Sequence, residues 1–154
     1  MIDIKLIVVG KIKEKYLEEA ILEYVKRIKP MASLSIIEIK EINQYEDNRN
    51  LKEEAKLILD NINDNSYVVT LEILGRELTS VEFSDFISKH YLYNNKQLVF
   101  VIGSSCGLDE EIKKISDYKL SFSKMTFPHQ LMRVIFLEQL YRALSIMNNM
   151  KYHK

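Results

Sequence analysis

The 154-residue chain has little of what several protein classes depend on. It contains a single cysteine, Cys106, which excludes an internal disulfide and a zinc site with several cysteines. No apolar run approaches the roughly 18 to 20 uninterrupted residues that span a bilayer. The apolar start of the chain carries Asp3 and Lys5 and has no small-residue cleavage site, which predicts a buried strand and not a signal peptide. We therefore expect a soluble, cytoplasmic protein with no membrane partner.

Common ligand motifs are absent too. The chain has no G-x-G-x-x-G sequence and no Walker loop, and no His, Asp or Glu spacing suggests a metal, so we expect none. The length and an apolar content of 47% suit one domain with its own core, spanning residues 1–154. The polar, acidic segment 40–50 has no proline or glycine hinge, which indicates a surface loop and not a domain boundary.

Short β-branched runs alternate with helical patterns along the chain, which is typical of βαβ units, an α/β fold and a largely parallel sheet. Thr79 and Glu82 form a T-x-x-E capping box at the start of one helix. Pro128 suits the first turn of the last helix. The patterns predict strands at 4–9, 34–39, 67–71, 98–102 and 118–122, and helices at 15–28, 51–61, 80–90, 109–115 and 128–147.

Charge is distributed unevenly in a chain whose formal net charge is zero. Residues 121–154 carry five Lys or Arg against the single acid Glu138, a net charge of +4, so residues 1–120 carry −4. This asymmetry indicates a local site for an anionic partner at the C-terminal end. The last predicted helix is also apolar over more than one stripe, so it is either central in a core or shared with a second subunit, and we expect the second, a homodimer.

A glycine-bounded turn, 103–107, follows the predicted strand at 98–102 and precedes a helix. The carboxyl ends of parallel strands are where such sheets bind ligands, so a ligand-binding turn is the first interpretation. The second is a plain structural turn. The third is the nucleophile elbow of a serine hydrolase, because the turn matches G-x-S-x-G with Ser105 as nucleophile, followed by Asp117 and then by His129 or His153.

The C-terminal third holds two further candidate regions. Segment 121–127 alternates small hydroxyl residues with Phe or Met, which suits either an edge strand or a loop that cradles a flat, adenine-like ligand. The second region offers cations for phosphates and planar groups for base stacking. It consists of His129, Arg133, Arg142, Tyr152 and His153. Glu138 and Arg142 have the spacing of an ordinary helical ion pair.

At these residues the chain resembles the RlmH family of SPOUT-class RNA methyltransferases. The C-terminal match is specific, whereas the N-terminal half adds little beyond element order and length. The resemblance is carried by segments 8–11, 68–71, 100–103 and 120–129, by Arg133, Glu138 and Gln139, and by segments 141–143 and 152–154.

The resemblance implies an α/β fold of the SPOUT type, with a parallel sheet flanked by helices and a C-terminal trefoil knot, an exception to the unknotted rule. It implies a homodimer whose knot and cofactor site lie mainly within 67–154. It also implies transfer of a methyl group from S-adenosyl-L-methionine to N3 of a pseudouridine in large-subunit (23S) ribosomal RNA. Because the net charge is near zero, we expect recognition of the assembled ribosome and not of free RNA.

Site residues carry over from the resemblance by position. Ser104 stands where the family commonly has glycine, and a serine at position 105 is ordinary in the family, which weakens the hydrolase interpretation. The cofactor site implied by the resemblance comprises Leu71, Gly103, Phe122, Ser123, Lys124, Met125, Thr126 and Phe127.

The catalytic hypotheses concern an imide nitrogen that must lose its proton before it can attack. His129 or His153 accepts or relays that proton, and Arg133 and Arg142 hold phosphate or the developing anion. Tyr152 stacks on the base, and Lys154 joins the RNA-binding tail. A composite site would form if one subunit's tail reached the other subunit's cofactor. A noncatalytic nucleotide-sensing dimer and the Ser105 hydrolase remain as alternatives.

Overall fold

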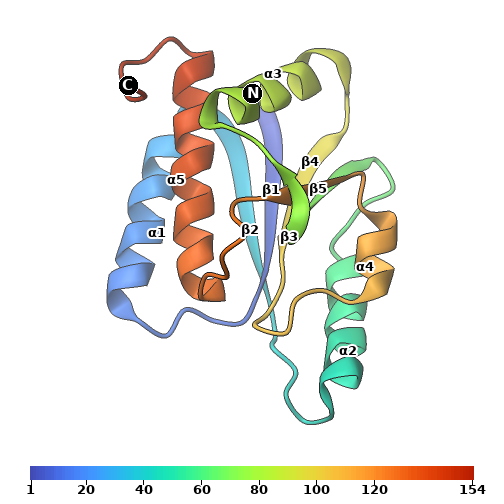
Figure 1. The fold of residues 1–154 in the computed structure, drawn as a ribbon. Coiled ribbons are helices and arrows are strands. Elements are labelled where there is room, and N and C mark those ends of the chain that lie inside the picture. The colour runs from blue at the N-terminus through green and yellow to red at the C-terminus, as the bar shows by residue number, and fades with distance from the viewer.

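A five-stranded, entirely parallel sheet forms the centre of the protein in a computed structural model that describes residues 1–154 (Figure 1). The strand order is β2-β1-β4-β3-β5. The predicted α/β architecture with a parallel sheet is therefore confirmed. The strands are β1 (Ile2–Val9), β2 (Ala32–Ile39), β3 (Ser66–Glu77), β4 (Gln97–Ile102) and β5 (Tyr118–Ser121).

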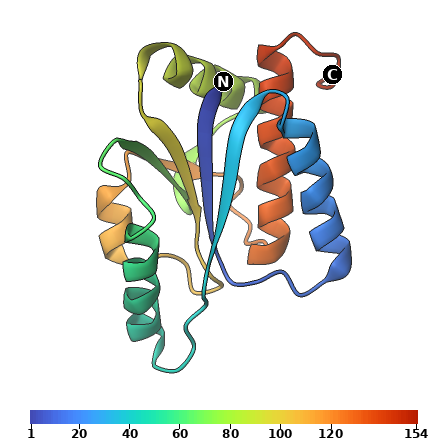
Figure 2. The same ribbon diagram turned by 180° about the vertical axis from the view of Figure 1, so that it is seen from behind.

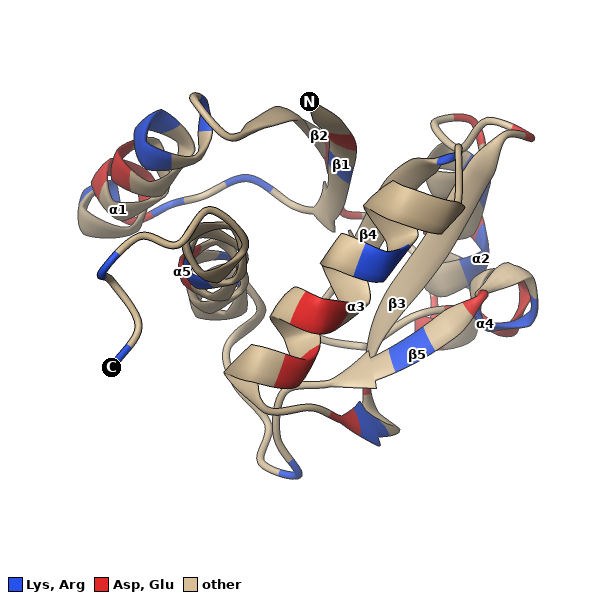
Figure 3. Cartoon of the chain, turned by 90° about the horizontal axis from the view of Figure 1, so that it is seen from above, with Lys and Arg blue, Asp and Glu red and all other residues tan.

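Helices cover both faces of this sheet (Figures 1 and 2). On one face lie α1 (Lys15–Ile28), α3 (Ser80–Tyr93) and α5 (His129–Met147). The other face is covered by α2 (Asp47–Leu59) and α4 (Glu110–Ile115). Seen from above, α5 lies between α1 and α3 and contacts both (Figure 3). No helix combines the length and the hydropathy that a membrane crossing needs.

The alternation of side chains along the central strands produces two separate cores. In β1, Ile4, Leu6 and Val8 pack under α1, α3 and α5, whereas Ile7 and Val9 pack under α2 and α4. All five are at most 1% exposed. Successive side chains of a strand point to opposite faces, so a strand covered on both sides needs apolar residues at every position. This requirement explains the unbroken apolar run that the sequence shows here.

Most elements lie within three residues of their predicted bounds, and two differ by more. α2 starts at Asp47 and not at 51, so the surface loop ends earlier than expected. The side chain of Asn50 exchanges hydrogen bonds with the main chain of Tyr45, each at 2.9 Å, and this contact holds the loop against the first turn. A pattern of apolar residues does not predict a hydrogen-bonded contact of this kind.

β3 is also longer than predicted, because it extends to Glu77. Leu120 of β5 pairs with both Leu71 and Arg76 of β3, so residues 72–75 leave the ladder between these two pairings. Gly75 then lies against the backbone of β5. A Cβ atom at position 75 would be 2.7 Å from the carbonyl of Lys119, so only glycine allows this approach.

Glu54 is a carboxylate buried beneath the sheet, only 2% exposed, on α2. One of its oxygens accepts a hydrogen bond from the Ile42 N–H at 2.9 Å. Burial raises the pKa of this carboxyl above its ordinary value of 4.5, and hydrogen bonds from Ile42 and the Ser104 hydroxyl oppose the rise. Glu54 therefore ties α2 to the segment after β2.

Replacing Glu54 with glutamine should change how stability depends on pH. Because folding raises this pKa, the stabilising contribution of Glu54 is present below about pH 4.5 and is lost as the pH rises through the folded-state value. Glu54→Gln keeps an acceptor for Ile42 but does not titrate, so its stability relative to the wild type should improve over that interval. Urea unfolding at several pH values tests this, and a pH-independent difference between the two proteins would contradict it.

Candidate active site

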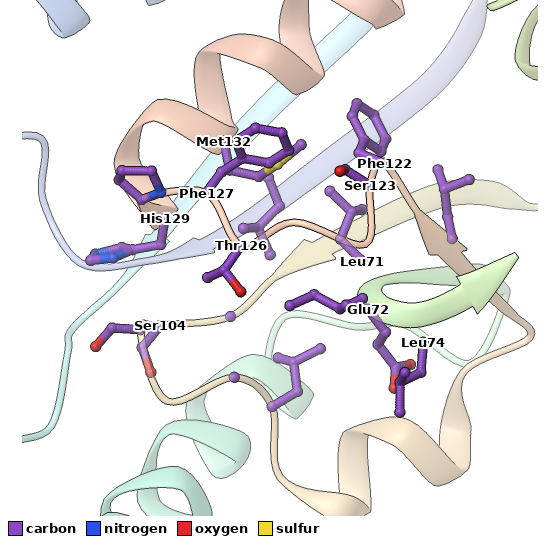
Figure 4. Close-up of a pocket in the computed structure, with 18 of the residues that line it drawn as sticks. Leu71, Glu72, Leu74, Ser104, Phe122, Ser123, Thr126, Phe127, His129 and Met132 are labelled. Carbon is purple, nitrogen blue, oxygen red and sulfur yellow. The ribbon is translucent and has the colours of Figure 1, made fainter. Parts of the chain in front are cut away.

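A cavity of about 630 Å³ opens at the carboxyl ends of β4 and β5 and beside the irregular part of β3. Its walls come from three segments, at residues 71–74, 102–108 and 120–129, together with Lys113 and Met132. In Figure 4 the 122–129 loop forms one wall, and Leu71, Glu72 and Ser104 face it. The position agrees with the rule that parallel sheets bind ligands beyond the carboxyl ends of their strands.

The lining combines apolar side chains with a few polar groups. Ten of the 20 lining residues are hydrophobic, which is typical of small-molecule sites with a flat organic ligand. Hydroxyl groups come from Ser104, Ser123 and Thr126, and an imidazole comes from His129. No three His, Cys, Asp or Glu side chains gather where a metal ion would be held. The chemistry of these walls fits an organic ligand with an aromatic ring and several polar atoms.

The turn after β4 is held by backbone contacts. Ser104 and Gly107 form an isolated antiparallel bridge, with a hydrogen bond of 2.9 Å from the Gly107 N–H to the Ser104 carbonyl. A Cβ atom at position 103 would be 2.3 Å from the carbonyl oxygen of Gly107, so position 103 requires glycine. Ser104 does not have a positive φ, so the serine occupies its place without backbone strain. The turn thus presents main-chain atoms to the cavity in a rigid arrangement.

Seven of the eight residues that the resemblance assigns to the cofactor line this cavity. The 122–127 loop is shaped by its own polar groups, since the Ser121 hydroxyl donates to the Ser123 carbonyl at 3.1 Å and the Ser123 hydroxyl accepts from the Met125 N–H at 2.9 Å. Lys124 is exposed and is not part of the wall. The seven are Leu71, Gly103, Phe122, Ser123, Met125, Thr126 and Phe127.

His129 and Arg133 lie at the start of α5 but face different surroundings. His129 lines the cavity and lies against Gly10. Arg133 is 2% exposed and is not part of the cavity wall. Its two Nη atoms donate to Glu38 at 2.9 Å and to the Gly10 carbonyl at 3.0 Å. Burial lowers the pKa of this guanidinium and the Glu38 carboxylate opposes the change. Arg133 therefore fastens the first turns of α5 to the carboxyl ends of β1 and β2.

The other tail residues form a cluster around Glu138. Arg142 donates twice to Glu138, at 3.0 and 2.5 Å, which confirms the predicted helical ion pair. The Tyr152 hydroxyl donates to the same carboxylate at 3.0 Å, and the Arg142 guanidinium lies 4.7 Å from the centre of the Tyr152 ring. Burial, followed by the Glu138 hydrogen bond, raises the pKa of Tyr152 to about 12, so this phenol stays protonated at neutral pH.

His153 completes this cluster, with its Nδ1 atom 3.1 Å from an Arg142 Nη atom. An arginine only donates, so Nδ1 accepts, and a neutral His153 carries its proton on Nε2. Lys154 is exposed at the end of the chain. Arg142 follows His129 by about 20 Å along the helix at 1.5 Å per residue, and no residue of the tail lines the cavity. The sequence placed His129 and Arg133 in one group with Arg142, Tyr152 and His153. In a single chain, the first two lie at the start of α5 and the other three lie near its end (Figure 1).

Several lining residues were missed by sequence reasoning. Glu72 and Leu74 belong to the part of β3 that leaves the ladder, beyond the strand end predicted at residue 71. The signal that was available there is Gly75, a lone glycine in a strand, which marks irregular pairing. Lys113 and Met132 reach the cavity from α4 and α5, and only the packing of these helices brings them there.

Comparison with known proteins agrees with this architecture. A solved structure described as a probable methylase family protein from Haemophilus influenzae superposes with a TM-score of 0.58 and 16% identity, covering 99% of this chain and 71% of that one. At that identity, the match shows the shared fold alone.

Sequence relatives are much closer. The chain is 51% identical to a putative ribosomal RNA large subunit methyltransferase H from Methanococcus vannielii and 46% identical to a ribosomal RNA large subunit methyltransferase H from Carboxydothermus hydrogenoformans. Each alignment covers 99% of both chains. A family model described as "Predicted SPOUT methyltransferase" matches residues 2–153. The chain therefore belongs to the RlmH family of SPOUT methyltransferases.

Proposed function

We propose that this protein uses S-adenosyl-L-methionine to methylate N3 of a pseudouridine in large-subunit (23S) ribosomal RNA, on the assembled ribosome. The observation that carries the proposal is the cavity at the strand ends, built from the segments that the family resemblance assigns to the cofactor. The relatives' names, which refer to large-subunit ribosomal RNA, support the substrate class. A substrate within the ribosome also implies a cytoplasmic location.

The cavity residues fit S-adenosyl-L-methionine. A volume of about 630 Å³ lies within the range of small-molecule sites. Phe122 and Phe127 supply apolar surface for a flat adenine ring, and the hydroxyls of Ser123 and Thr126 supply hydrogen-bonding groups. The Gly103 turn adds a rigid main-chain edge. When bound, the cofactor supplies a methyl group on an electrophilic sulfonium, so the protein's remaining tasks are alignment and proton removal.

We assign these tasks to residues at the two ends of α5. His129 is the imidazole that lines the cavity, so it is the group proposed to accept the N3 proton. His153 presents an Nε2–H donor while Arg142 occupies its Nδ1 atom, which suits holding an oxygen of the RNA. Arg142, Tyr152 and Lys154 are proposed RNA contacts. Arg133 is proposed as a positioning residue, because Glu38 and the main chain already hold its guanidinium.

A homodimer would bring the cavity of one subunit, with His129, close to the tail residues of the other subunit. The outward stripe of α5 carries Leu131, Ile135 and Ile146 around the Glu138–Arg142 pair, and Leu131 is 38% exposed. At the cavity rim, Leu74 is 98% exposed and Met125 is 75% exposed. Exposed apolar groups at both places favour cover by a second copy of the chain. The tail of one subunit would then complete the cavity of the other.

The trefoil knot implied by the family is proposed for the same region. Residues 72–75 leave the β3–β5 ladder and Gly75 lies against Lys119, so the segment after Leu71 crosses closely over β5. After β5 and the 122–128 loop, α5 returns to the face of the sheet that α1 and α3 cover. This close crossing is the feature that supports a threaded chain.

The geometry does not complete the triad of the serine hydrolase alternative, although Ser105 and His129 both line the cavity. Ser105 is exposed at the turn, but Asp117, the acid that a triad would need, uses its carboxylate to accept a hydrogen bond from the Val68 N–H at 2.8 Å. The Asp117 N–H in turn donates to the Val68 carbonyl. This residue therefore joins β5 to β3.

The central test is methyl transfer to ribosomes from cells that lack the endogenous modification. Purified protein with methyl-labelled S-adenosyl-L-methionine should place label on one large-subunit pseudouridine, located by nuclease digestion and mass spectrometry. Label on another base or on protein would reject the proposed substrate. Cofactor binding without transfer to ribosomes would favour the nucleotide-sensing dimer.

Gly103→Ala should weaken cofactor binding by about tenfold or more, because the new Cβ atom forces the turn away from the Gly107 carbonyl. Isothermal titration calorimetry with S-adenosyl-L-methionine measures the affinity, and thermal unfolding verifies that the variant is folded. Cys106→Ala is the control, because the Cys106 side chain is exposed in the same turn and does not line the cavity. Wild-type affinity in folded Gly103→Ala would contradict the assignment.

A mixed-dimer experiment tests the composite site. Gly103→Ala damages the cavity and Arg142→Ala damages the tail, so each homodimer should be nearly inactive. Random mixing by denaturation and refolding makes roughly half of the dimers mixed, and each mixed dimer regains one intact site, restoring roughly a quarter of wild-type activity. The control for refolding is a mixture of the double variant Gly103→Ala/Arg142→Ala with the wild type. No recovery in the first mixture would reject a site shared between subunits.

A further inference from the structure

Lys11 and Lys13 lie on the segment that joins β1 to α1, and Lys15 is the first residue of α1. All three lysines are exposed, and we call them together the basic loop. None of the three has an acidic partner within 4.0 Å, although Glu14 lies among them in the sequence. In Figure 3, blue basic positions mark the chain between β1 and α1. The loop is an exception in residues 1–120, which are acidic as a whole.

The main chain of the basic loop is fastened to the edge of the candidate active site. Gly10, which precedes the loop, lies against His129, so that a Cβ atom there would be 3.8 Å from the imidazole Nε2. The Lys13 N–H donates to the side-chain oxygen of Gln130 at 3.0 Å. His129 and Gln130 are the first residues of α5. The backbone of the loop is therefore held in place beside the cavity, while its three ammonium groups remain free.

This arrangement suits the phosphates of a nucleic acid strand. Lysine side chains make contacts to phosphates that position a strand without reading its sequence. A nucleotide that enters the cavity beside His129 has neighbours on both sides, and the basic loop lies next to His129 and Gln130, within reach of the adjoining strand. Fixed backbone with free ammonium groups is what such a positioning contact requires.

We propose that the basic loop binds phosphates of the ribosomal RNA strand next to the target nucleotide. The inference rests on the proposed function, since it takes the ribosome as substrate. It adds a binding surface on the N-terminal part of the chain, apart from the cofactor cavity and from the cationic tail. The loop would set the position of the strand, and the cavity and tail would act on the base.

The test compares two triple variants that remove the same charge. In the first, Lys11, Lys13 and Lys15 are replaced with glutamine. The control variant replaces three exposed lysines that have no acid within 4.0 Å and lie away from the cavity: Lys29, Lys52 and Lys96. Binding to ribosomes is measured by cosedimentation over a range of salt concentrations, without cofactor, so the result does not depend on methyl transfer.

The basic-loop variant should bind ribosomes about tenfold or more weakly, and its salt dependence should fall by about 0.7 to 0.9 of a log unit per lost phosphate contact. Replacement with arginine should restore both. In the methyl-transfer assay, KM for ribosomes should rise while the affinity for S-adenosyl-L-methionine stays the same. Failure of the wild type to methylate ribosomes would instead concern the proposed function.

Three results would overturn the inference. Unchanged ribosome affinity in the basic-loop variant would show that the loop is solvated and unbound. Equal loss in the control variant would show nonspecific attraction spread over the surface. Weaker binding with an unchanged salt dependence would assign the loop to an acidic ribosomal protein, because counterion release is a property of the phosphate backbone.

Discussion

Burial of β1 and β4 on both faces is the constraint on which the rest of the structure depends. Every residue from Ile4 to Val9 except Lys5 is apolar and at most 1% exposed, and helices must cover both sides of the sheet to achieve this. Parallel strands joined by helices then end at one edge. The irregular part of β3 and the segments that follow β4 and β5 meet at that edge, and Gly10 after β1 lies against His129 there. One short chain can therefore build a cavity from segments far apart in sequence.

The backbone at this edge of the sheet is held in position by close contacts that leave no space for a larger side chain. The Gly103 turn closes against the Gly107 carbonyl, and Gly75 lies against Lys119. Buried polar groups add to these contacts, since Glu54 holds the segment after β2 and Arg133 holds the start of α5. Arg133 is buried whereas its partner Glu38 is 44% exposed, so losing Glu38 would leave a buried guanidinium without its counter-charge. Such groups fix where the loops lie more than how stable the fold is.

In a single chain, α5 keeps the cavity apart from the cluster of side chains around Glu138. Its first residue lines the cavity, whereas Arg142, Tyr152 and His153 gather around Glu138 near the other end. A rigid helix cannot fold back on itself to join its ends. The proposed dimer supplies the missing partner, and the basic loop beside His129 supplies an additional cationic surface on the cavity side. On this proposal, the RNA is held from two sides by different subunits.

Local signals in the sequence determined the class of fold, the order of the elements and two candidate segments that contribute to the cavity wall, the 103–107 turn and the 121–127 loop. The apolar runs of β1 and β4, the Thr79 capping box and the glycines at 103 and 107 act over a few neighbours, so they are legible in sequence. The tertiary structure alone decided that Arg133 contacts Glu38, that Lys124 is exposed and outside the cavity wall, and that Glu72 and Lys113 belong to that wall. These outcomes depend on which distant part of the chain each side chain contacts. Its burial and its hydrogen bonds are decided only when the helices pack against the sheet.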